Sequence, residues 1–379
     1  MTDFEKMLTE CLESRQPFER MVIANDEKTG LEVSVVMHDT TLGPALGGTR
    51  WHPFSTRTEA LVDNQRLAKD MTYKLALAVG EDTELAQAGI SFGGGKAVIR
   101  GQPTQGKDKR NEQLRAYAAL INSLAGKFVT SVDVGTSVED MIAMKEMTQW
   151  VAGLPKEMGG SGDPSPATAQ GVAWGIRACL EAVFDTDSFQ GKIVAVQGIA
   201  GKVGGILARD LASQGAKLIG SGGVNQSAAQ KIAAELGAKL VAPHEIYDQQ
   251  CDVFAACAMG GILNDNTIPR LRCRITAGGA NNQLWEPIRH AGMLQDRGIL
   301  HAPAFWINAG GVINVAHELH PKGYSEERAA ADIRKVYDRG KTIMDISRKE
   351  KVTPYSVAIR LAEDRIRKAR TTGCPAISL

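Results

Sequence analysis

The stretch KIVAVQGIAGKVGGILARDLASQGAKLIGSGG, residues 192–223, decides the fold of this chain. A short apolar run leads into a glycine-rich turn, a helical pattern follows, and a second apolar run closes the unit. The same alternation continues through KIAAELGAKLV (231–241), CDVFAAC (251–257) and RITAGGA (274–280). Strands separated by helices predict right-handed crossovers and a mostly parallel sheet, so the expected fold class is α/β.

The glycines of this stretch predict a dinucleotide site, because they let backbone N–H groups approach a pyrophosphate at a helix N-terminus. The spacing here is GxxGxxG, whereas the usual fingerprint is GxGxxG. Gly222 stands where an acidic residue would bind the ribose, and no arginine closely follows it. The choice between NAD and NADP therefore stays open. The predicted cofactor-binding residues here are Gly198, Gly201, Lys202, Val203, Gly204 and Gly222.

The N-terminal half predicts a separate region. LEVSVVMH (31–38) is typical of a strand, TLGPALGGTR (41–50) of a Gly/Pro-rich loop, and residues 57–78 of a helix. KFVTSVDVG (127–135) indicates a strand that runs into a loop. The composition changes most sharply at GGSGDPSPATAQG, residues 159–171, a pattern common between domains.

Two helices are expected near the C-terminus. Ser325 is a plausible cap for the first, and Thr353 for the second, with Pro354 at its first helical position. We expect a first domain over residues 1–157, completed by helices within 341–379, and a dinucleotide-binding domain over 158–340.

One further stretch, ISFGGGKAVI (90–99), places three glycines directly before Lys96. In the simpler interpretation, a glycine-rich turn leads into a strand and Lys96 points at water. In the other, the glycines let backbone approach a ligand while the amine is held out of water beside it. The other motifs of the chain favour the second interpretation.

Composition excludes several classes of function. The chain has 379 residues, enough for two domains, and its 44 basic and 43 acidic residues give a net charge of +1. That balance predicts neither nucleic acid nor an anionic membrane as partner. The six cysteines lack zinc spacing, so no metal is expected. The charged N-terminus lacks an apolar run typical of a signal peptide, and the expected location is cytoplasmic.

Eight segments together resemble the glutamate/leucine/phenylalanine/valine dehydrogenase family, and most closely its leucine dehydrogenases. They are HDTTLGPALGGTR, MTYK, GGGKAVI, DVGTSVEDM, GDPSPATAQGV, VAVQG, GGANNQL and INAGGVINVA, in the family's order over nearly the whole chain. The resemblance implies two domains flanking a cleft, an N-terminal α/β substrate domain and a Rossmann-like cofactor domain. It also implies C-terminal helices that return to the first domain, and homo-oligomers. Family members deaminate an L-amino acid oxidatively and reversibly to its 2-oxo acid and ammonia, with NAD or NADP.

The resemblance also implies roles for single residues. Lys96 would be the catalytic lysine and Asp133 its acidic partner, while Lys74 would hold the substrate carboxylate. Two lysines in different environments can take these opposite roles, because burial and like charge favour the neutral amine while a facing carboxylate favours the ammonium. The remaining implied substrate-binding residues are Gly47, Gly48, Met71, Leu46, Asn308, Val312 and Val315. Thr168 and Asn282 would contact the nicotinamide side of the cleft.

The side-chain pocket implied by the resemblance is apolar, since it includes Leu46, Val312 and Val315, with Ser131 and Val132 beside them. A second substrate carboxylate there would lack partners, so glutamate is disfavoured. We expect a dehydrogenase of leucine, valine or isoleucine. An aromatic amino acid dehydrogenase and a catalytically silent binding protein are the alternatives. The silent alternative is prompted by the altered glycine turn, by Gly222, and by about ten extra residues near 79–88 between the two lysines.

Overall fold

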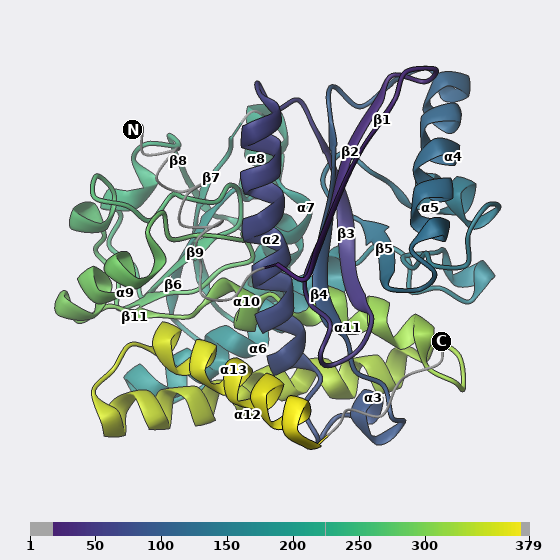
Figure 1. Ribbon diagram of the computed structural model, residues 1–379. Coiled ribbons are helices and arrows are strands. Elements are labelled where there is room, and N and C mark those ends of the chain that lie inside the picture. Colours follow the sequence, from purple (N-terminus) through teal and green to yellow (C-terminus); the bar gives the residue numbers. More distant parts are fainter. Residues whose placement is uncertain (1–17, 224, 373–379) are drawn as a thin grey trace. The chain divides into compact units, whose positions relative to one another are not determined.

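The computed structural model describes residues 18–223 and 225–372 (Figure 1). The contacts between residues divide the chain into two compact units. The first unit consists of three segments, which are the chain up to Asp163, Asn314–Ala329, and the residues from Glu363 onward. The second unit consists of Pro164–Ile313 and Ala330–Ala362. The domain boundaries expected from the sequence, after residues 157 and 340, stay a prediction.

The first unit contains a mixed five-stranded sheet in the order β1-β2-β4-β3-β5. β1 and β2 form an antiparallel pair, β2 is antiparallel to β4, and the β4–β3 and β3–β5 pairs are parallel. The strands are β1 Arg20–Asp26, β2 Leu31–Asp39, β3 Ala45–His52, β4 Gly93–Arg100 and β5 Phe128–Val132.

Helices cover both faces of this sheet (Figure 1). α2, Arg57–Ala78, packs on one face, and its bounds agree with the helix expected at 57–78. α4 (Lys107–Ser123) and α5 (Val138–Lys145) pack on the other, where Ala97 and Ile99 of β4 join the core. Because side chains alternate along a strand, Lys96 points to the opposite face, under α2.

The segment 41–50 was expected to be a loop, and this was wrong for its second half. Ala45–His52 forms β3, which lies between β4 and β5 inside the sheet. A side-chain carbon at Gly47 would lie 1.9 Å from the carbonyl oxygen of Gly95. The glycines of this segment therefore allow close packing against a neighbouring strand, a need that sequence alone does not separate from a turn.

The three glycines before Lys96 have the same physical reason. Gly93–Gly95 lie inside β4 and do not form a turn before it. A side-chain carbon at Gly94 would lie 2.0 Å from the backbone nitrogen of Thr72 in α2. Gly94 thus lets a helix backbone approach the strand, while side-chain carbons at Gly93 and Gly95 would meet Asp39 and Phe128. The expectation that the amine is withdrawn from water is confirmed, since Lys96 is only 4% exposed.

The extra residues near 79–88 fold onto the first unit. They form a short helix, α3 (Glu84–Gln87), whose N-cap is Thr83. Thr83 and Leu85 are fully buried, so this segment is anchored in the unit by its own core residues. Exposed Glu81 also contacts Lys368 in the C-terminal helix at 2.7 Å.

The second unit is a parallel α/β structure, as the sequence predicted. Its six strands follow the order β11-β10-β9-β6-β7-β8, and every pairing between them is parallel. The strands are β6 Ile193–Gln197, β7 Lys217–Ser221, β8 Lys239–Val241, β9 Val253–Ala256, β10 Ile275–Thr276 and β11 Leu300–His301. The helices between and beside them are α6 Ser165–Phe184, α7 Lys202–Ser213, α8 Gln226–Leu236, α9 Pro287–Asp296, α10 Ala304–Ile307 and α11 Gly310–Ala316.

The chain ends in two long helices, α12 (Glu326–Glu350) and α13 (Pro354–Thr372). Their expected caps are confirmed, because Ser325 Oγ accepts a hydrogen bond from the Arg328 N–H and Thr353 Oγ1 accepts one from the Ser356 N–H. The last turns of α13 belong to the first unit. There Arg365 donates to the carbonyl oxygen of Ala76 at 2.7 Å, so the end of α13 returns to the first unit as expected.

Among the described residues, no helix combines the length and the apolar character needed to cross a membrane.

Candidate active site

Lys96 and Asp133 form a charged pair at the candidate site. Lys96 lies in β4, and Asp133 follows the last residue of β5. The Lys96 Nζ atom is 3.0 Å from Asp133 Oδ2, and the lysine side chain is only 5% exposed. Two segments that are distant in sequence are thus joined by one buried ion pair, as the resemblance implied for these two residues.

Lys74 reaches the same region from α2. It is 6% exposed, and its charge interacts with those of Lys96 and Asp133. Burial and the nearby Lys96 lower the pKa of Lys74 to about 8, although Asp70 one helical turn earlier and Asp133 act in the opposite direction. Two amines therefore share one weakly hydrated space, in which neither ammonium ion is fully stabilised.

Burial also lowers the pKa of Lys96, and the neighbouring Arg50 adds to this effect, whereas Asp133 opposes it. Burial works against the charge of Asp133. The attraction of Lys96 and Arg50 nonetheless lowers the pKa of Asp133 to about 2. The site therefore holds one firmly ionised carboxylate beside an amine that loses its proton more readily than an ordinary lysine.

Arg50 and Asp63 belong to this cluster and were missed in the sequence. Arg50 Nε donates to Asp133 Oδ2 at 3.2 Å, and Arg50 Nη1 donates to Asp63 Oδ2 at 2.8 Å. Arg50 lies in β3, within the segment that was expected to be a loop. Had the strand been recognised, its alternation would have put Arg50 on the same face as Leu46 and Gly48.

The other expected residues of the first unit fall into two groups. Leu46 is fully buried in β3, and a side-chain carbon at Gly48 would lie 3.0 Å from Asp133 Cβ. Met71 lies three residues before Lys74, on the same side of α2, and is 8% exposed. Val132, in contrast, packs against the core of the opposite face of the sheet, so it lies away from Lys96.

Val315, at the end of α11, is buried in the first unit, while Val312 belongs to the second. Asn308 precedes α11, and its Nδ2 donates to Asn281 Oδ1 at 2.8 Å and to the Gly279 carbonyl at 3.1 Å. Its Oδ1 is buried and has no partner among the described residues. Asn308, at the end of α10, is therefore hydrogen-bonded to the loop that carries Asn282, a residue in the left-handed conformation with φ 48°.

Thr168 lies in the first turn of α6. Its hydroxyl donates to the Pro164 carbonyl at 2.9 Å, and a side-chain carbon at Gly311 would lie 2.3 Å from it. The missing side chain at Gly311 is what allows α6 and α11 to approach at this point.

The glycine turn of the second unit joins β6 to α7. A hydrogen bond of 2.9 Å from the Gly201 N–H to the Gly198 carbonyl closes the turn, which accommodates the one extra residue of the GxxGxxG spacing. A side-chain carbon at Gly204 would lie 2.3 Å from the Gly198 carbonyl oxygen, so the helix packs directly on the turn. α7 begins at Lys202 without a side-chain cap. Its first N–H groups fit an anionic ligand such as a pyrophosphate.

Gly222 lies beside this turn. The N–H groups of Gly198 and Ile199 donate to the Ser221 carbonyl at 3.0 and 3.1 Å, so the ends of β6 and β7 are in direct contact. The position expected to bind a ribose is therefore adjacent to the glycine turn, as in a dinucleotide site. A side-chain carbon at Gly222 would lie 2.6 Å from Ala229 Cβ in α8, whereas Gly223 has open space around it.

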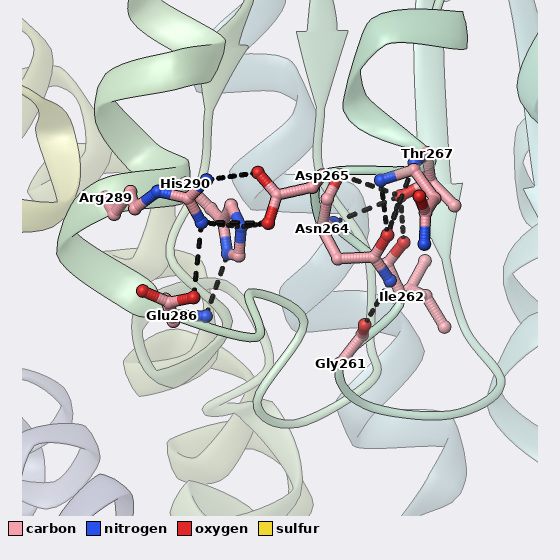
Figure 2. A network of polar contacts seen from close by, with 9 residues as sticks. Gly261, Ile262, Asn264, Asp265, Thr267, Glu286, Arg289 and His290 are labelled. Atoms are coloured by element: carbon pink, nitrogen blue, oxygen red, sulfur yellow. Dashed lines mark hydrogen bonds and ion pairs between the residues drawn. The ribbon is translucent and has the colours of Figure 1, made fainter. Parts of the chain in front are cut away.

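A second polar cluster, Asp265, Glu286 and His290, brings three potential metal-ligand atoms close together (Figure 2). Arg289 lies among them and pairs with both carboxylates. His290 Nδ1 accepts the Glu286 N–H at 2.8 Å, which leaves Nε2 facing Asp265 at 3.5 Å. A guanidinium occupies the position of a cation between these carboxylates, so we interpret the cluster as an ion-pair network. It holds α9 to the Asn264–Thr267 loop.

Comparison with known proteins agrees with this geometry. Residues 19–150 match the Glu/Leu/Phe/Val dehydrogenase dimerisation domain, and residues 159–226 and 222–372 match Glutamate/Leucine/Phenylalanine/Valine dehydrogenase. Leucine dehydrogenase of Geobacillus stearothermophilus is 45% identical over 357 residues, which cover 93% of each chain. Phenylalanine dehydrogenase of Lysinibacillus sphaericus is 41% identical over 358 residues, 93% of this chain and 90% of the relative.

A solved structure, that of L-tryptophan dehydrogenase from Nostoc punctiforme, superimposes with a TM-score of 0.74 at 37% identity, and covers 97% of this chain and 100% of its own. The chain therefore belongs to the glutamate/leucine/phenylalanine/valine dehydrogenase family, whose members use a nicotinamide cofactor, and it is an amino acid dehydrogenase.

Proposed function

We propose that the protein oxidatively deaminates an apolar L-amino acid of the leucine, valine or isoleucine type. One amino acid, one oxidised nicotinamide cofactor and one water give the 2-oxo acid, an ammonium ion, the reduced cofactor and one proton, and the reaction is reversible. The observation that carries this proposal is the buried Lys96 amine, 3.0 Å from the Asp133 carboxylate, with Lys74 beside it.

In the proposed reaction, Lys74, Asp133 and Lys96 have separate roles. Lys74 binds the substrate carboxylate, which restores its own positive charge. Asp133 accepts a proton from the substrate ammonium group, so that a hydride can leave Cα and form an imine. Lys96, in its neutral form, takes a proton from the water that adds to the imine carbon. The resulting carbinolamine collapses to the 2-oxo acid and ammonia, which leaves protonated.

The cofactor is NAD in this proposal. Gly198, Gly201 and Gly204, with Lys202 and Val203, would hold its pyrophosphate at the start of α7, and Thr168 and Asn282 would flank the nicotinamide. When bound, the nicotinamide supplies the acceptor for the hydride from Cα. NAD is preferred to NADP because Gly222 and Gly223 offer no cation for a 2′-phosphate.

The apolar substrate class rests on Leu46, on the lysine face of the sheet, and on Val315 of α11, which the family resemblance assigns to the side-chain pocket. Leu46 is fully buried, and Val315 is 4% exposed. A glutamate side chain against these two residues would lose its hydration without gaining a partner, at a cost of several kcal/mol. We also assign Gly47, Gly48, Met71, Asn308 and Val312 to substrate binding, as the family resemblance implies.

The direct test measures reduced cofactor by absorbance with a panel of L-amino acids and both NAD and NADP. We expect activity with leucine, valine and isoleucine and little with glutamate. Glutamate as the preferred substrate would contradict the proposal. No turnover with any amino acid, together with no dinucleotide binding by calorimetry, would favour a silent binding protein.

One observation favours a second candidate, an aromatic amino acid dehydrogenase. Ser131 Oγ lies on the lysine face of the sheet, is buried, and has no partner among the described residues. A buried unpaired hydroxyl is costly, and the indole N–H of tryptophan would satisfy it. If tryptophan is the preferred substrate, Ser131→Ala should reduce kcat/KM for tryptophan much more than for phenylalanine. Equal losses for both would exclude this role for Ser131.

We propose in addition that the protein forms a homo-oligomer. β1 is an edge strand, and Met21 and Ile23 on it are 41% and 62% exposed. An exposed apolar edge strand is a site for pairing with another chain, and the matching family domain is described as a dimerisation domain. Light scattering should give a mass above that of one chain, and Ile23→Lys should reduce it.

A further inference from the structure

The guanidinium of Arg50 joins three neighbouring strands. Arg50 lies in β3, between β4 with Lys96 and β5, which leads into Asp133. Its Nε atom and the Lys96 Nζ atom contact the same carboxylate oxygen, Asp133 Oδ2, at 3.2 and 3.0 Å. Its other end is held by Asp63 in α2 at 2.8 Å. The side chain is only 18% exposed, so these contacts fix it in one orientation.

We infer that Arg50 is a positioning residue of the proposed deamination, a permanent cation that orients the Asp133 carboxylate toward Lys96 and disfavours the ammonium form of Lys96. This inference rests on the proposed function. Arg50 acts through Asp133 and Lys96, and it does not itself touch the reacting atoms. Asp63 holds Arg50 in place and partly balances its charge.

The charges around Lys96 explain why an arginine is needed. Lys96 faces Asp133 from the end of β5, Arg50 from β3, and Asp63 and Lys74 from α2. Asp133 alone would stabilise the Lys96 ammonium ion, which cannot accept a proton from water. A second cation on the same oxygen weakens that stabilisation. Arginine suits this task because it stays protonated and its planar group has donors in several directions, whereas a lysine has one point charge.

The expected consequence is a shift in the pH dependence of turnover. If the positive charge at position 50 is removed, Lys96 takes up a proton more readily and its pKa rises. The neutral amine is the active form for water addition, so activity on the acid side should fall while activity at high pH recovers. An ion pair with a purely structural role would lower stability or activity equally at all pH values.

The experiment compares kcat/KM against pH for wild type, Arg50→Gln and Arg50→Lys, with the best substrate of the panel. Arg100→Gln is the matched control, because Arg100 lies on the same strand as Lys96 and pairs with Glu32 at 2.7 Å without touching Asp133. For Arg50→Gln we expect the acid limb, the low-pH side on which kcat/KM rises with pH, to move up by about one pH unit. At a given pH on that side, kcat/KM should then fall about tenfold. Arg50→Lys should keep the limb near that of wild type with a lower kcat, and Arg100→Gln should leave the limb unchanged.

A second readout does not depend on turnover. Acetylation of Lys96 in the folded protein, followed by mass spectrometry across pH, reports the neutral amine directly, and Arg50→Gln should need a higher pH for the same labelling. An unshifted limb and unshifted labelling in Arg50→Gln would overturn the inference. An equal shift in Arg50→Lys would overturn it as well, because the charge would then not be the cause. Silence of wild type with every amino acid would instead contradict the proposed function, and the labelling result would still decide the role of Arg50.

Discussion

Two buried lysines determine the chemistry at the scale of single residues. Lys74 and Lys96 both have lowered pKa values, first because both are buried, and then because a nearby cation acts on each, Lys96 on Lys74 and Arg50 on Lys96. The resemblance implies opposite roles for the two lysines, but in the protein without substrate the pKa values of both amines are lowered. In our proposal the bound substrate gives the two lysines different protonation states, because its carboxylate favours the ammonium form of Lys74 and leaves Lys96 as the neutral base.

Replacing Lys96 by alanine should therefore abolish most turnover without unfolding the protein. We expect kcat to fall by about 10²–10⁴-fold, the usual contribution of a positioned acid–base group. Steady-state kinetics measures the loss, and circular dichroism checks the fold. Lys28→Ala, at an exposed position of the same unit, serves as the control. Near-normal turnover of Lys96→Ala would refute its assigned role.

The cofactor preference can be changed at one residue. An aspartate at Gly222 would meet Ala229, since a side-chain carbon there lies 2.6 Å from Ala229 Cβ, but Gly223 is open. We expect Gly223→Asp to lower KM for NAD and raise it for NADP, through hydrogen bonds to the ribose hydroxyls and repulsion of a 2′-phosphate. Gly292→Asp, also in open space and without a left-handed backbone but in α9, is the control. An unchanged NAD/NADP ratio in Gly223→Asp would place the ribose elsewhere.

At the scale of elements, the sequence predicted α2, α7, α8, α12 and α13 and most strands of the second unit, but it did not predict β1, α4 or α5, and it took β3 for a loop. Hydrophobic periodicity predicted the bounds of α2, and capping residues predicted where α12 and α13 begin. β3 contains Gly47 and Gly48 because its neighbours β4 and β5 leave no space for side chains at these two positions. Such tertiary crowding leaves no periodic pattern in the sequence. Arg50 was missed for the same reason, since its place on a strand was not visible.

Gly94 sets how closely α2 approaches β4, so a methyl group there should disturb both stability and substrate binding. Gly94→Ala would put a carbon 2.0 Å from the Thr72 nitrogen, two residues before Lys74. We expect a loss of about 1–3 kcal/mol in the free energy of unfolding and a higher KM for the amino acid. Urea unfolding and kinetics measure the two effects. Gly292→Ala, in α9 with no neighbouring atom in the way, should be neutral or stabilising.

Glu318 anchors the segment that leads out of the first unit's sheet. Its carboxylate accepts hydrogen bonds from the N–H groups of Gly153, Leu154 and Ser161 and from the Ser161 hydroxyl. A glutamine presents an amide group to some of these donors, so Glu318→Gln should cost about 1–3 kcal/mol in the free energy of unfolding.

Chemical denaturation would measure this loss. The control is Glu326→Gln, which removes an exposed ion pair with Lys156 and should change stability by no more than about 0.5 kcal/mol. If the two variants lose the same stability, the hydrogen bonds to Glu318 do not anchor the segment.

At the scale of the whole molecule, each of the two units has its own buried histidine. His38 lies in the first unit and His301 in the second, and burial lowers their pKa values to about 4 and about 3. In the unfolded chain a histidine has a pKa of about 6.5. Below that pH the unfolded state binds more protons than the folded state, so stability falls as the pH decreases toward 4.

The expected slope is about 1.4 kcal/mol per pH unit for each histidine within that window. Urea unfolding at several pH values between 6.5 and 4 measures it. Because carboxylates also titrate, the informative quantity is the difference between wild type and His301→Asn, whose slope should be shallower. Replacing exposed His244 by asparagine is the matched control and should keep the wild-type slope. Identical slopes in all three proteins would show that His301 is not kept neutral by the fold.

Arg50 lies on β3, Lys96 on β4 and Asp133 directly after β5, so the three side chains come together only when these adjacent strands have paired. The ribosome must release the chain past residue 133, and the two parallel pairings must close across their long connections, before the amine meets its carboxylate. Until then Lys96 is an ordinary protonated side chain, poorly nucleophilic toward cellular aldehydes and acyl donors. The Lys96 amine thus becomes a nucleophile only in the folded chain. A lysine-selective probe could therefore separate mature enzyme from nascent or misassembled molecules in a cell extract.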